Sequence, residues 1–502
     1  MTDMVTDLPV YLSVCFALFA IFGSVFAYSC YLFYVHRLYS HIPSPPRDSF
    51  FFGHVPYIRR ERTRGREIHE VVIEWTNKYG PIIVFWAFHN PVVFVVSPEM
   101  VKKVLVTYDL PKSTRVYEKL QFVYNQRCTG RGILTEPDPS AWHKKRTLLN
   151  PAFHRKNLMN LMSPFNVICE RMIDKLSLIS DGKTQVDLAD ELSRTTLDVI
   201  GKVAFDIDLD AIKDDNTPFP SANSSTLMGI QQQFRSPFWR INPFMYPYQQ
   251  KVIKDIKFLR EFGEKVILKR KAAIEKGMDM PKDVLNHILY MCKEDVNVPM
   301  EELVDDFVTF FIAGQETTSN LLAFTVFEIG NNPDIEQRIQ NEISKVLGSR
   351  QFVEYQDLGK LQYLGQTLKE SLRLHPPIPG FSRFTPDAIE LGGYAIPANT
   401  GIAVDVFATH RYPGVWTEPD KFNPHRFGPG SDDTITSSMF LPFANGPRTC
   451  IGKMFAEFEA KVIMARLYQE FKIKLVPGQK LLYDLHLTMR PKGGVLCTLD
   501  KR

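Results

Sequence analysis

The sequence of 502 residues lacks the patterns that indicate several common kinds of protein. Its seven cysteines are an odd number without a C-x-x-C pair, which argues against a disulfide framework and for a reducing compartment. Its 12 histidines form no H-E-x-x-H or other metal-ligand spacing. The net charge of +4 is too small to indicate a nucleic-acid partner, and no repeat or low-complexity tract is present. The chemistry must therefore lie in short individual motifs.

The most informative motif surrounds Cys450, in the run F-A-N-G-P-R-T-C-I-G over residues 443–452. Such a run is typical of a loop that seats a haem iron on a cysteine thiolate, a ligand that favours O–O cleavage. Gly446 permits a tight turn under a flat ring, and Arg448 can reach a haem propionate. Phe443 can cover the sulfur. The apolar run that follows predicts a helix, whose N-terminus would lower the pKa of the Cys450 thiol.

This run has two other interpretations. A buried structural cysteine in a Gly/Pro-rich turn is the first. A phosphate-binding loop is the second, and the spacing excludes it. One residue too many separates Gly446 from Gly452, and Met454 stands where Ser or Thr must bind magnesium.

A long apolar pattern between Pro299 and Gly330 predicts a helix roughly 48 Å long at 1.5 Å per residue. Within it lies the run A-G-Q-E-T-T over residues 313–318. The hydroxyl of Thr317 can bond to the carbonyl of residue 313 and bend the helix, which makes a pocket for dioxygen. Glu316 beside this alcohol can relay protons from water. The alternative is a core helix that contains Gly and Thr for packing alone.

These motifs resemble those of the haem-thiolate monooxygenases, the cytochrome P-450 superfamily. The resemblance implies a mainly α fold with small β-sheets and a single large catalytic domain. It implies haem b with its iron bound by Cys450, and Glu316 and Thr317 as the catalytic acid–alcohol pair. Electrons would come from NADPH only indirectly, through an NADPH–cytochrome reductase.

A structural lock is also implied by the resemblance. Glu370 and Arg373 stand three residues apart in E-S-L-R, and Arg426 follows in F-N-P-H-R-F. In the family such residues join by charge-assisted bonds and hold the cysteine loop. In isolation, the first pair would be an ordinary surface ion pair.

Further residues are expected around the haem. Trp142 and Arg146 are four residues apart and share one helical face, so both can point at one propionate. Arg383 is another candidate for a propionate. Lys144 and Lys145 would point away from the haem. Together with a third lysine, Lys453, they are expected to dock an acidic reductase.

Two β regions are predicted from runs of β-branched and aromatic residues. Residues 81–86 and 92–96 form a hairpin, which His89-Asn90-Pro91 interrupts. A turn at residues 491–494 precedes a strand at 495–499. The rest of the chain is expected to be mostly helical.

The N-terminal segment predicts a membrane anchor. Leu8 to Val35 is free of charge, and about 20 residues suffice to span a bilayer. Its start is acidic and its length exceeds that of a signal peptide, so we expect an uncleaved anchor. Arg37 and Arg47 follow, which places the rest of the chain in the cytosol. The acceptor pattern at Asn223 is then expected to carry no glycan.

The resulting domain prediction has three parts. Residues 1–36 are the anchor, residues 37–48 are a proline-rich hinge, and residues 49–502 are the monooxygenase domain. Family members with this layout lie in the endoplasmic reticulum membrane. Residues 234–248 interleave aromatic and basic residues, which indicates a second membrane contact at the mouth of the substrate channel. Plain core packing is the alternative there.

The substrate is predicted from shorter segments. Residues 308–314, 357–364, 427–430, 475–479 and 495–499 resemble the branch of the family that hydroxylates the side chain of cholesterol at position 24. This implies a sterol pocket that includes Phe311 and Ala313. The fatty-acid ω-hydroxylases compete with it, but many of them carry a glutamate where this chain has Ala313. A lipid-peroxide isomerase or a haem sensor is a further alternative, and neither needs the Glu316–Thr317 pair.

Overall fold

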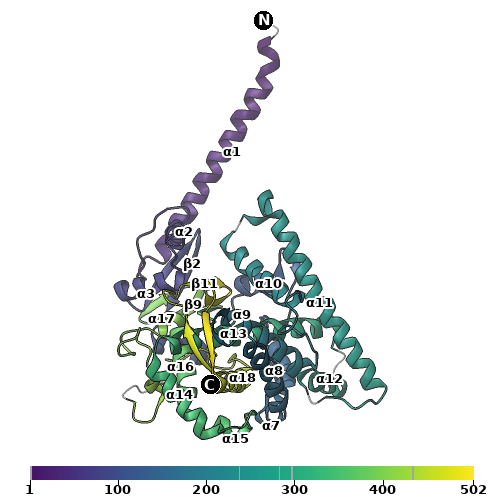
Figure 1. The fold of residues 1–502 in the computed structure, drawn as a ribbon. Coiled ribbons are helices and arrows are strands. Elements are labelled where there is room, and N and C mark those ends of the chain that lie inside the picture. The colour runs from purple at the N-terminus through teal and green to yellow at the C-terminus, as the bar shows by residue number, and fades with distance from the viewer. Residues whose placement is uncertain (1–2, 237, 282, 296–297, 432–434) are drawn as a thin grey trace.

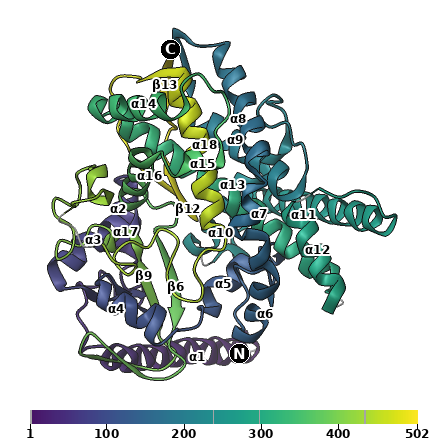
Figure 2. The same cartoon turned by 90° about the horizontal axis from the view of Figure 1, so that it is seen from below.

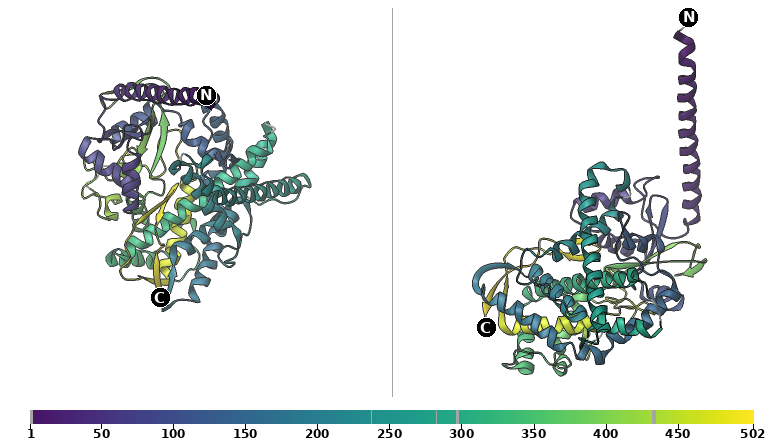
Figure 3. Two further views of the ribbon diagram at one scale, coloured as in Figure 1. Left: turned by 90° about the horizontal axis from the view of Figure 1, so that it is seen from above. Right: turned by 90° about the vertical axis from the view of Figure 1, so that its right-hand side faces the viewer.

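A computed structural model describes residues 3–502, apart from residues 237, 282, 296–297 and 432–434 (Figure 1). The protein is one large, mostly helical domain with small sheets, from which the first helix projects (Figure 3). The predicted fold class is thereby confirmed. The helices are α1 (Asp3–Leu38), α2 (Val55–Thr63), α3 (Ile68–Tyr79), α4 (Pro98–Lys102), α5 (Thr114–Gln121), α6 (Pro139–Leu149), α7 (Arg155–Met159), α8 (Met162–Ser177), α9 (Leu188–Val199), α10 (Pro218–Arg235), α11 (Tyr246–Glu275), α12 (Val284–Asp295), α13 (Met300–Gly330), α14 (Pro333–Leu347), α15 (Tyr355–Leu358), α16 (Gln362–Leu374), α17 (Val406–Thr409) and α18 (Lys453–Glu470).

Five small sheets are present in the described part of the chain. The largest has the strand order β1-β2-β9-β6, and a second has the order β10-β13-β5. The other three are the pairs β11-β12, β3-β4 and β7-β8. The strands are β1 (Ile82–Ala87), β2 (Asn90–Val95), β3 (Phe122–Val123), β4 (Gln126–Arg127), β5 (Asp181–Asp187), β6 (Gly380–Phe384), β7 (Ile389–Leu391), β8 (Tyr394–Ile396), β9 (Gly401–Asp405), β10 (Phe471–Leu475), β11 (Tyr483–His486), β12 (Thr488–Pro491) and β13 (Leu496–Lys501).

The predicted hairpin is confirmed as β1 and β2, which pair antiparallel from Ile82↔Val95 to Ala87↔Asn90. Phe88 completes the turn with φ at 57°. The alternate residues of β1 enter two different hydrophobic clusters, because both faces of this sheet are covered. The predicted C-terminal turn at residues 491–494 is present too. It joins strands of two different sheets, since β12 pairs with β11 and β13 pairs with β10.

The end of α1 packs on this first sheet. Val35 and Tyr39 are buried, and the Tyr39 hydroxyl lies 2.7 Å from the hydroxyl of Thr400. The proline-rich stretch then follows β1, where the Pro43 carbonyl accepts a hydrogen bond of 2.8 Å from the Val84 N–H. These contacts set the angle at which α1 leaves the domain. The stretch is thus fastened to the sheet and does not act as a free spacer.

Helix α13 occupies the middle of the molecule, beside α18 (Figure 2). Its bounds confirm the helix predicted between residues 299 and 330. It contacts α9, α11, α16 and α18, so nearly its whole circumference is covered. Its middle and C-terminal half are mostly apolar, as expected for a buried helix, and polar side chains such as Asp305 and Glu316 are buried with them. The core therefore surrounds the segment that carries the predicted acid–alcohol pair.

Candidate active site

The loop that carries Cys450 runs into α18, for which Gly452 is the N-cap residue. The helix predicted after the cysteine is thus confirmed. The Cys450 N–H donates to the Phe443 carbonyl at 2.9 Å, and the Thr449 hydroxyl donates to the same carbonyl at 3.1 Å. Gly446 has φ at 77°, and a Cβ there would lie 2.2 Å from the carbonyl oxygen of Leu105. Only glycine fits both this close approach to a distant segment and the positive φ of the turn.

The thiol of Cys450 combines an interior position with an accessible surface. Part of its surface is exposed, whereas Cys128, Cys169 and Cys497 are buried. Burial among surrounding residues nevertheless raises the pKa of the Cys450 thiol. Both observations hold if the sulfur borders an internal space in the protein.

The direction of that shift differs from the prediction. The Gly452 N–H and the charges of Arg146 and Lys453 lower the pKa of Cys450, but burial outweighs them. The N-terminus of α18 alone does not make this thiol acidic. A bound metal ion would supply the missing charge, since a coordinating thiol is deprotonated outright.

One face of α13 is also accessible. Between Leu303 and Val326 every residue of the helix is buried except Ala313, Gly314 and Thr317. These three share one face, because residues three and four apart lie above one another. The Thr317 hydroxyl donates to the Ala313 carbonyl at 2.7 Å, as predicted. The accessible face therefore presents small side chains and one alcohol.

Glu316 lies on a different side of α13 from Thr317. Its carboxylate accepts hydrogen bonds from the Thr488 hydroxyl at 3.2 Å and from the Asn320 amide at 3.4 Å. The side chain is only 7% exposed. Among the hydrogen bonds of the described residues, Glu316 thus faces β12. A relay from this carboxylate to Thr317 requires at least one intervening group.

Phe311 is not part of the accessible face, which corrects the prediction. It is 1% exposed and packs against Phe219 and Phe307, with ring centroids 6.0 and 5.9 Å away. The physical reason is the helical period, since two residues correspond to a rotation of about 200°. Ala313, by contrast, lies on the accessible face.

Positive charge gathers close to the cysteine loop. The guanidinium of Arg448 lies 4.0 Å from the ring centroid of Trp142 and donates to the Glu136 carbonyl at 2.9 Å. Arg383 is 3% exposed and donates to the Ser382 carbonyl at 3.0 Å. Neither arginine has an ion pair with a carboxylate among the described residues. Two such cations fit an anionic group that the protein itself does not provide.

Arg146 and Trp142 share one face of α6, as predicted, but make different contacts. Arg146 donates to the carbonyl of Thr449 at 2.9 Å, beside the cysteine. Its charge acts on the Cys450 thiol. Trp142 instead packs under Arg448. Both residues therefore contact the cysteine loop, Arg146 at Thr449 and Trp142 at Arg448.

The predicted lock is assembled in the core. The guanidinium of Arg373 donates to both carboxylate oxygens of Glu370 at 2.8 Å, and both side chains are fully buried. Arg426 approaches the same carboxylate at 3.3 Å. Arg373 also donates to the His410 and Pro419 carbonyls. These bonds tie α16 to the segment that leads into the cysteine loop.

The three lysines predicted to dock a reductase separate into two groups. Lys144 and Lys453 are exposed. Lys145 instead forms ion pairs with Glu302 at 2.5 Å and Asp306 at 3.9 Å. The Lys145 side chain points from α6 to the first turns of α13, which carry both carboxylates. The prediction that Lys145 points to a partner protein is therefore wrong.

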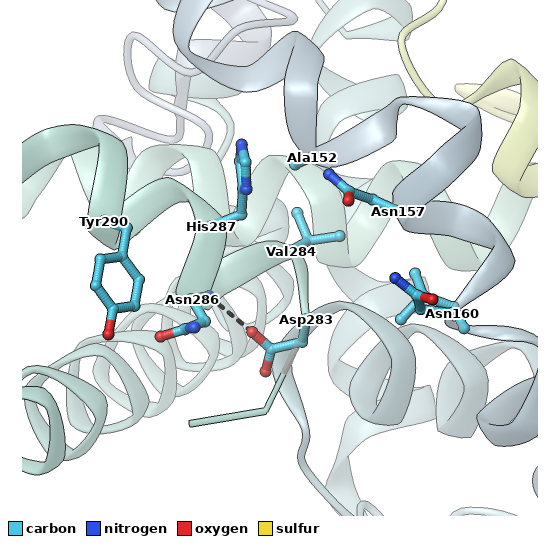
Figure 4. Close-up of a pocket in the computed structure, with 9 residues that line it drawn as sticks. Ala152, Asn157, Asn160, Asp283, Val284, Asn286, His287 and Tyr290 are labelled. Carbon is cyan, nitrogen blue, oxygen red and sulfur yellow. Dashed lines mark hydrogen bonds between the residues drawn. The ribbon is translucent and has the colours of Figure 1, made fainter. Parts of the chain in front are cut away.

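Two pockets lie outside this region. One separates α12 from α7 and is lined by polar side chains, among them Asn157, Asn160 and Asp283 (Figure 4). The Asp283 carboxylate accepts from the Asn286 N–H at 2.7 Å there. The second lies between α10, α11 and β11 and includes Arg235. It adjoins residues 238–246, in which the large hydrophobic side chains of Phe238, Ile241, Phe244 and Tyr246 are exposed.

These observations fit a haem with its two propionates. Cys450 supplies an accessible sulfur, α13 supplies small residues, and Arg383 and Arg448 supply cations without carboxylate partners. A further buried cation, Lys112, lies among them and was missed by sequence reasoning. A single lysine after a proline gives no motif. Only its pairing with β6 places it here.

Comparisons with known proteins find one family and relatives that match most of the chain. A family model described as Cytochrome P450 matches residues 43–498. Cytochrome P450 4d2 of Drosophila melanogaster is 28% identical over 457 residues, which cover 87% of this chain and 89% of that protein. An 11-oxo-beta-amyrin 30-oxidase of Glycyrrhiza uralensis is 30% identical over 449 residues, 86% and 83% of the two chains. Cytochrome P450 3A12 of Canis lupus familiaris is 27% identical over 414 residues, 79% and 80%.

Proposed function

The chain belongs to the cytochrome P450 family, and on that premise we propose that it hydroxylates the side chain of cholesterol. The family is one of monooxygenases with a thiolate-ligated haem iron, which take electrons from a redox partner and act on lipophilic substrates. The coarse activity is therefore that of a haem-thiolate oxidoreductase. The observation that carries the finer assignment is the uncharged, small-residue face of α13.

Cys450 is proposed as the iron ligand. When bound, the haem activates dioxygen, and the thiolate donates electron density that favours O–O cleavage. Cys450 is suited to this role because its sulfur is accessible while the loop around it is fixed by bonds to the Phe443 carbonyl. Arg448 and Arg383 are proposed to bind the propionates, with Trp142 packed under Arg448. Arg146 holds the loop through Thr449.

Thr317 is proposed to hold and pass on the protons that oxygen cleavage consumes. Its hydroxyl is the polar group on the accessible face of α13. Glu316 is proposed as the carboxylate that restores those protons, through Thr488 or water. A proton-transfer group of this kind typically contributes 10²- to 10⁴-fold to a rate. A haem sensor or a lipid-peroxide isomerase would need neither residue.

The proposed sterol substrate rests on Ala313. A methyl group on the accessible face leaves room for an apolar ring system and presents no charge to it. Many fatty-acid ω-hydroxylases resemble this chain but carry a glutamate there, so fatty-acid hydroxylation is the second candidate. One relative that matches most of the chain is named as an oxidase of 11-oxo-beta-amyrin.

The proposed setting is the endoplasmic reticulum membrane, with an NADPH–cytochrome reductase as the electron donor. Residues 12–38 form the one helix in the described chain that is long and apolar enough to cross a membrane, with a mean hydropathy of 2.0. The exposed residues 238–246 lie on the side of the domain from which α1 leaves (Figure 1). We propose that they contact the same bilayer, so that a sterol enters through the adjoining pocket.

The test is product analysis with the full-length protein, a reductase, NADPH and a panel of sterols and fatty acids. Cholesterol is expected to shift the haem to high spin and to give a side-chain alcohol, while lauric acid does so weakly. Ala313→Glu places a carboxylate on the accessible face and is expected to abolish the cholesterol shift. Stronger binding and faster turnover of lauric acid would establish the fatty-acid candidate instead.

A further inference from the structure

Lys112 lies beside the predicted propionate residues although no motif marks it. Residue 112 forms an antiparallel bridge with Arg383, and the Phe384 N–H donates to the Pro111 carbonyl at 3.0 Å. Residues directly opposite in an antiparallel pair present their side chains on the same face. The backbone therefore holds Lys112 and Arg383 side by side.

The ammonium group of Lys112 is almost fully enclosed. The residue is 6% exposed, and its Nζ donates to the carbonyl of Leu134. The same atom lies 4.5 Å from the ring centroid of Tyr117. No carboxylate forms an ion pair with Lys112 among the residues that the structure describes. Its three donors are thus only partly used.

Three buried or half-buried cations consequently face one another. Burial lowers the pKa of Lys112 well below its ordinary value, and Arg383 and Arg448 add to this effect. Arg383 and Arg448 also act on each other as like charges. Like charges at such positions are unfavourable unless an anion joins them. Folding would not retain this arrangement for its own stability.

We propose that Lys112 is a further haem-binding residue, which donates to a propionate together with Arg383. Two propionates carry two negative charges, which would offset much of the charge of these three cations. The Leu134 bond gives the assignment a second consequence. Since one ammonium group would hold both the propionate and the Leu134 carbonyl, haem binding would fix the segment between α5 and α6. The inference rests on the proposed haem site at Cys450.

The experiment compares Lys112→Met and Lys112→Gln with the unaltered full-length protein. Methionine removes both the charge and the donor, while glutamine keeps a neutral donor for the Leu134 carbonyl. Haem transfer to apomyoglobin is the first readout. Both variants are expected to lose haem about 10- to 100-fold faster, the effect of one charge-assisted hydrogen bond. The reduction potential is the second readout and should fall, because a positive charge near the iron favours the ferrous state.

Lys461→Met is the matched control. Lys461 also donates to a backbone carbonyl, that of Leu358 at 2.6 Å, and burial also lowers its pKa. Its haem retention and potential should equal those of the parent. Lys112→Arg, which keeps the charge, should restore the potential.

The outcomes separate the two proposals. If the parent shows no thiolate-haem spectrum, the proposed function is wrong. If the parent spectrum is normal and both Lys112 variants behave like Lys461→Met, only the role of Lys112 is wrong. If methionine weakens haem retention and glutamine does not, the Leu134 bond alone matters, and the propionate contact is overturned.

Discussion

The side of the molecule that carries Cys450 and the side from which α1 leaves are built by opposite means. Around the cysteine, charged residues are buried: Glu370 and Arg373 are fully enclosed, and Arg383 is 3% exposed. Beside α1, apolar residues are exposed, with Ile241 at 79% and Phe244 at 92%. The first region thus buries charged side chains, and the second exposes apolar side chains to solvent.

This difference explains what each region can specify. A buried charge needs particular partners at particular distances, so its sequence is constrained and forms short motifs. An exposed apolar surface needs only area and no fixed geometry. The proposed chemistry therefore depends on individual atoms, whereas the proposed entrance for the substrate depends on composition.

The largest expected effect is that of replacing Cys450, in the region of buried charges. Cys450→Ala is expected to lose the reduced carbon-monoxide band of thiolate haem and all hydroxylation, because no other described side chain in this loop offers a thiolate. Absorption spectra of the purified protein measure this. Cys30→Ala, an exposed cysteine on α1, should leave the band unchanged. A Cys450 variant that kept the band would remove the assignment.

The buried lock gives the next largest effect. Glu370→Ala leaves Arg373 and Arg426 without their carboxylate and is expected to destabilise the domain by about 3–5 kcal/mol. Haem content and the midpoint of thermal inactivation report it. Glu74→Ala is the control, since its pair with Arg66 at 2.8 Å is about half exposed and contributes under about 1 kcal/mol. Equal effects would show that burial of the charges does not matter.

Removal of the Thr317 hydroxyl on α13 tests the proposed chemistry without disturbing the core. Thr317→Ala is expected to keep haem and sterol binding, to consume NADPH, and to form hydrogen peroxide with about 100-fold less alcohol product. Thr325→Ala removes an equivalent helical bond, to the Leu321 carbonyl at 2.7 Å, and should couple normally. Normal coupling in Thr317→Ala would move the relay to Glu316 or Thr318.

Substitutions in the exposed apolar segment should change substrate affinity alone. Ile241→Asp with Phe244→Asp is expected to raise KM for a membrane-dissolved sterol by about 3- to 10-fold and to leave kcat unchanged, because the entrance no longer enters the bilayer. Kinetics in phospholipid vesicles measure it. Phe352→Asp, half exposed elsewhere, serves as control. An unchanged KM would assign these residues to another role.

The smallest effect concerns electron delivery. Lys144→Glu with Lys453→Glu is expected to slow reduction by the reductase by about 2- to 10-fold at low salt and to weaken its salt dependence. Substrate affinity should stay constant. Lys254→Glu, an exposed lysine of α11, is the control. Stopped-flow reduction that is identical in both variants would exclude this docking face.

The features that the sequence predicts well are those with a local cause. The bond from Thr317 to Ala313 follows from the four-residue period of a helix, and the glycine at position 446 follows from the positive φ of its own turn, 77°. The bounds of α13 follow from its apolar length and the Pro and Gly at its ends. Each depends on neighbours within a few residues.

The features that the sequence misses depend on distant segments. Lys112 gains its place from a bridge to residue 383, and Lys145 is captured by the carboxylates of α13. The family resemblance places Phe311 in the pocket, although its helical phase opposes that of Ala313. Asn223 fits an acceptor pattern, yet it is 1% exposed and bonded to Gln315 in the core. The absence of a glycan at Asn223 would therefore follow from the burial of this side chain as well as from a cytosolic location of the domain.

The fastening of α1 to the first sheet has a mechanical consequence. The apolar helix from Leu12 to Leu38 is about 40 Å long at 1.5 Å per residue, whereas the hydrocarbon layer of a bilayer is about 30 Å thick. A helix longer than the layer tilts. In the proposed membrane setting, the domain is expected to tilt with α1, because Tyr39 and Pro43 are bonded to it. The thickness of the lipid layer would then set the height of the proposed entrance relative to the membrane.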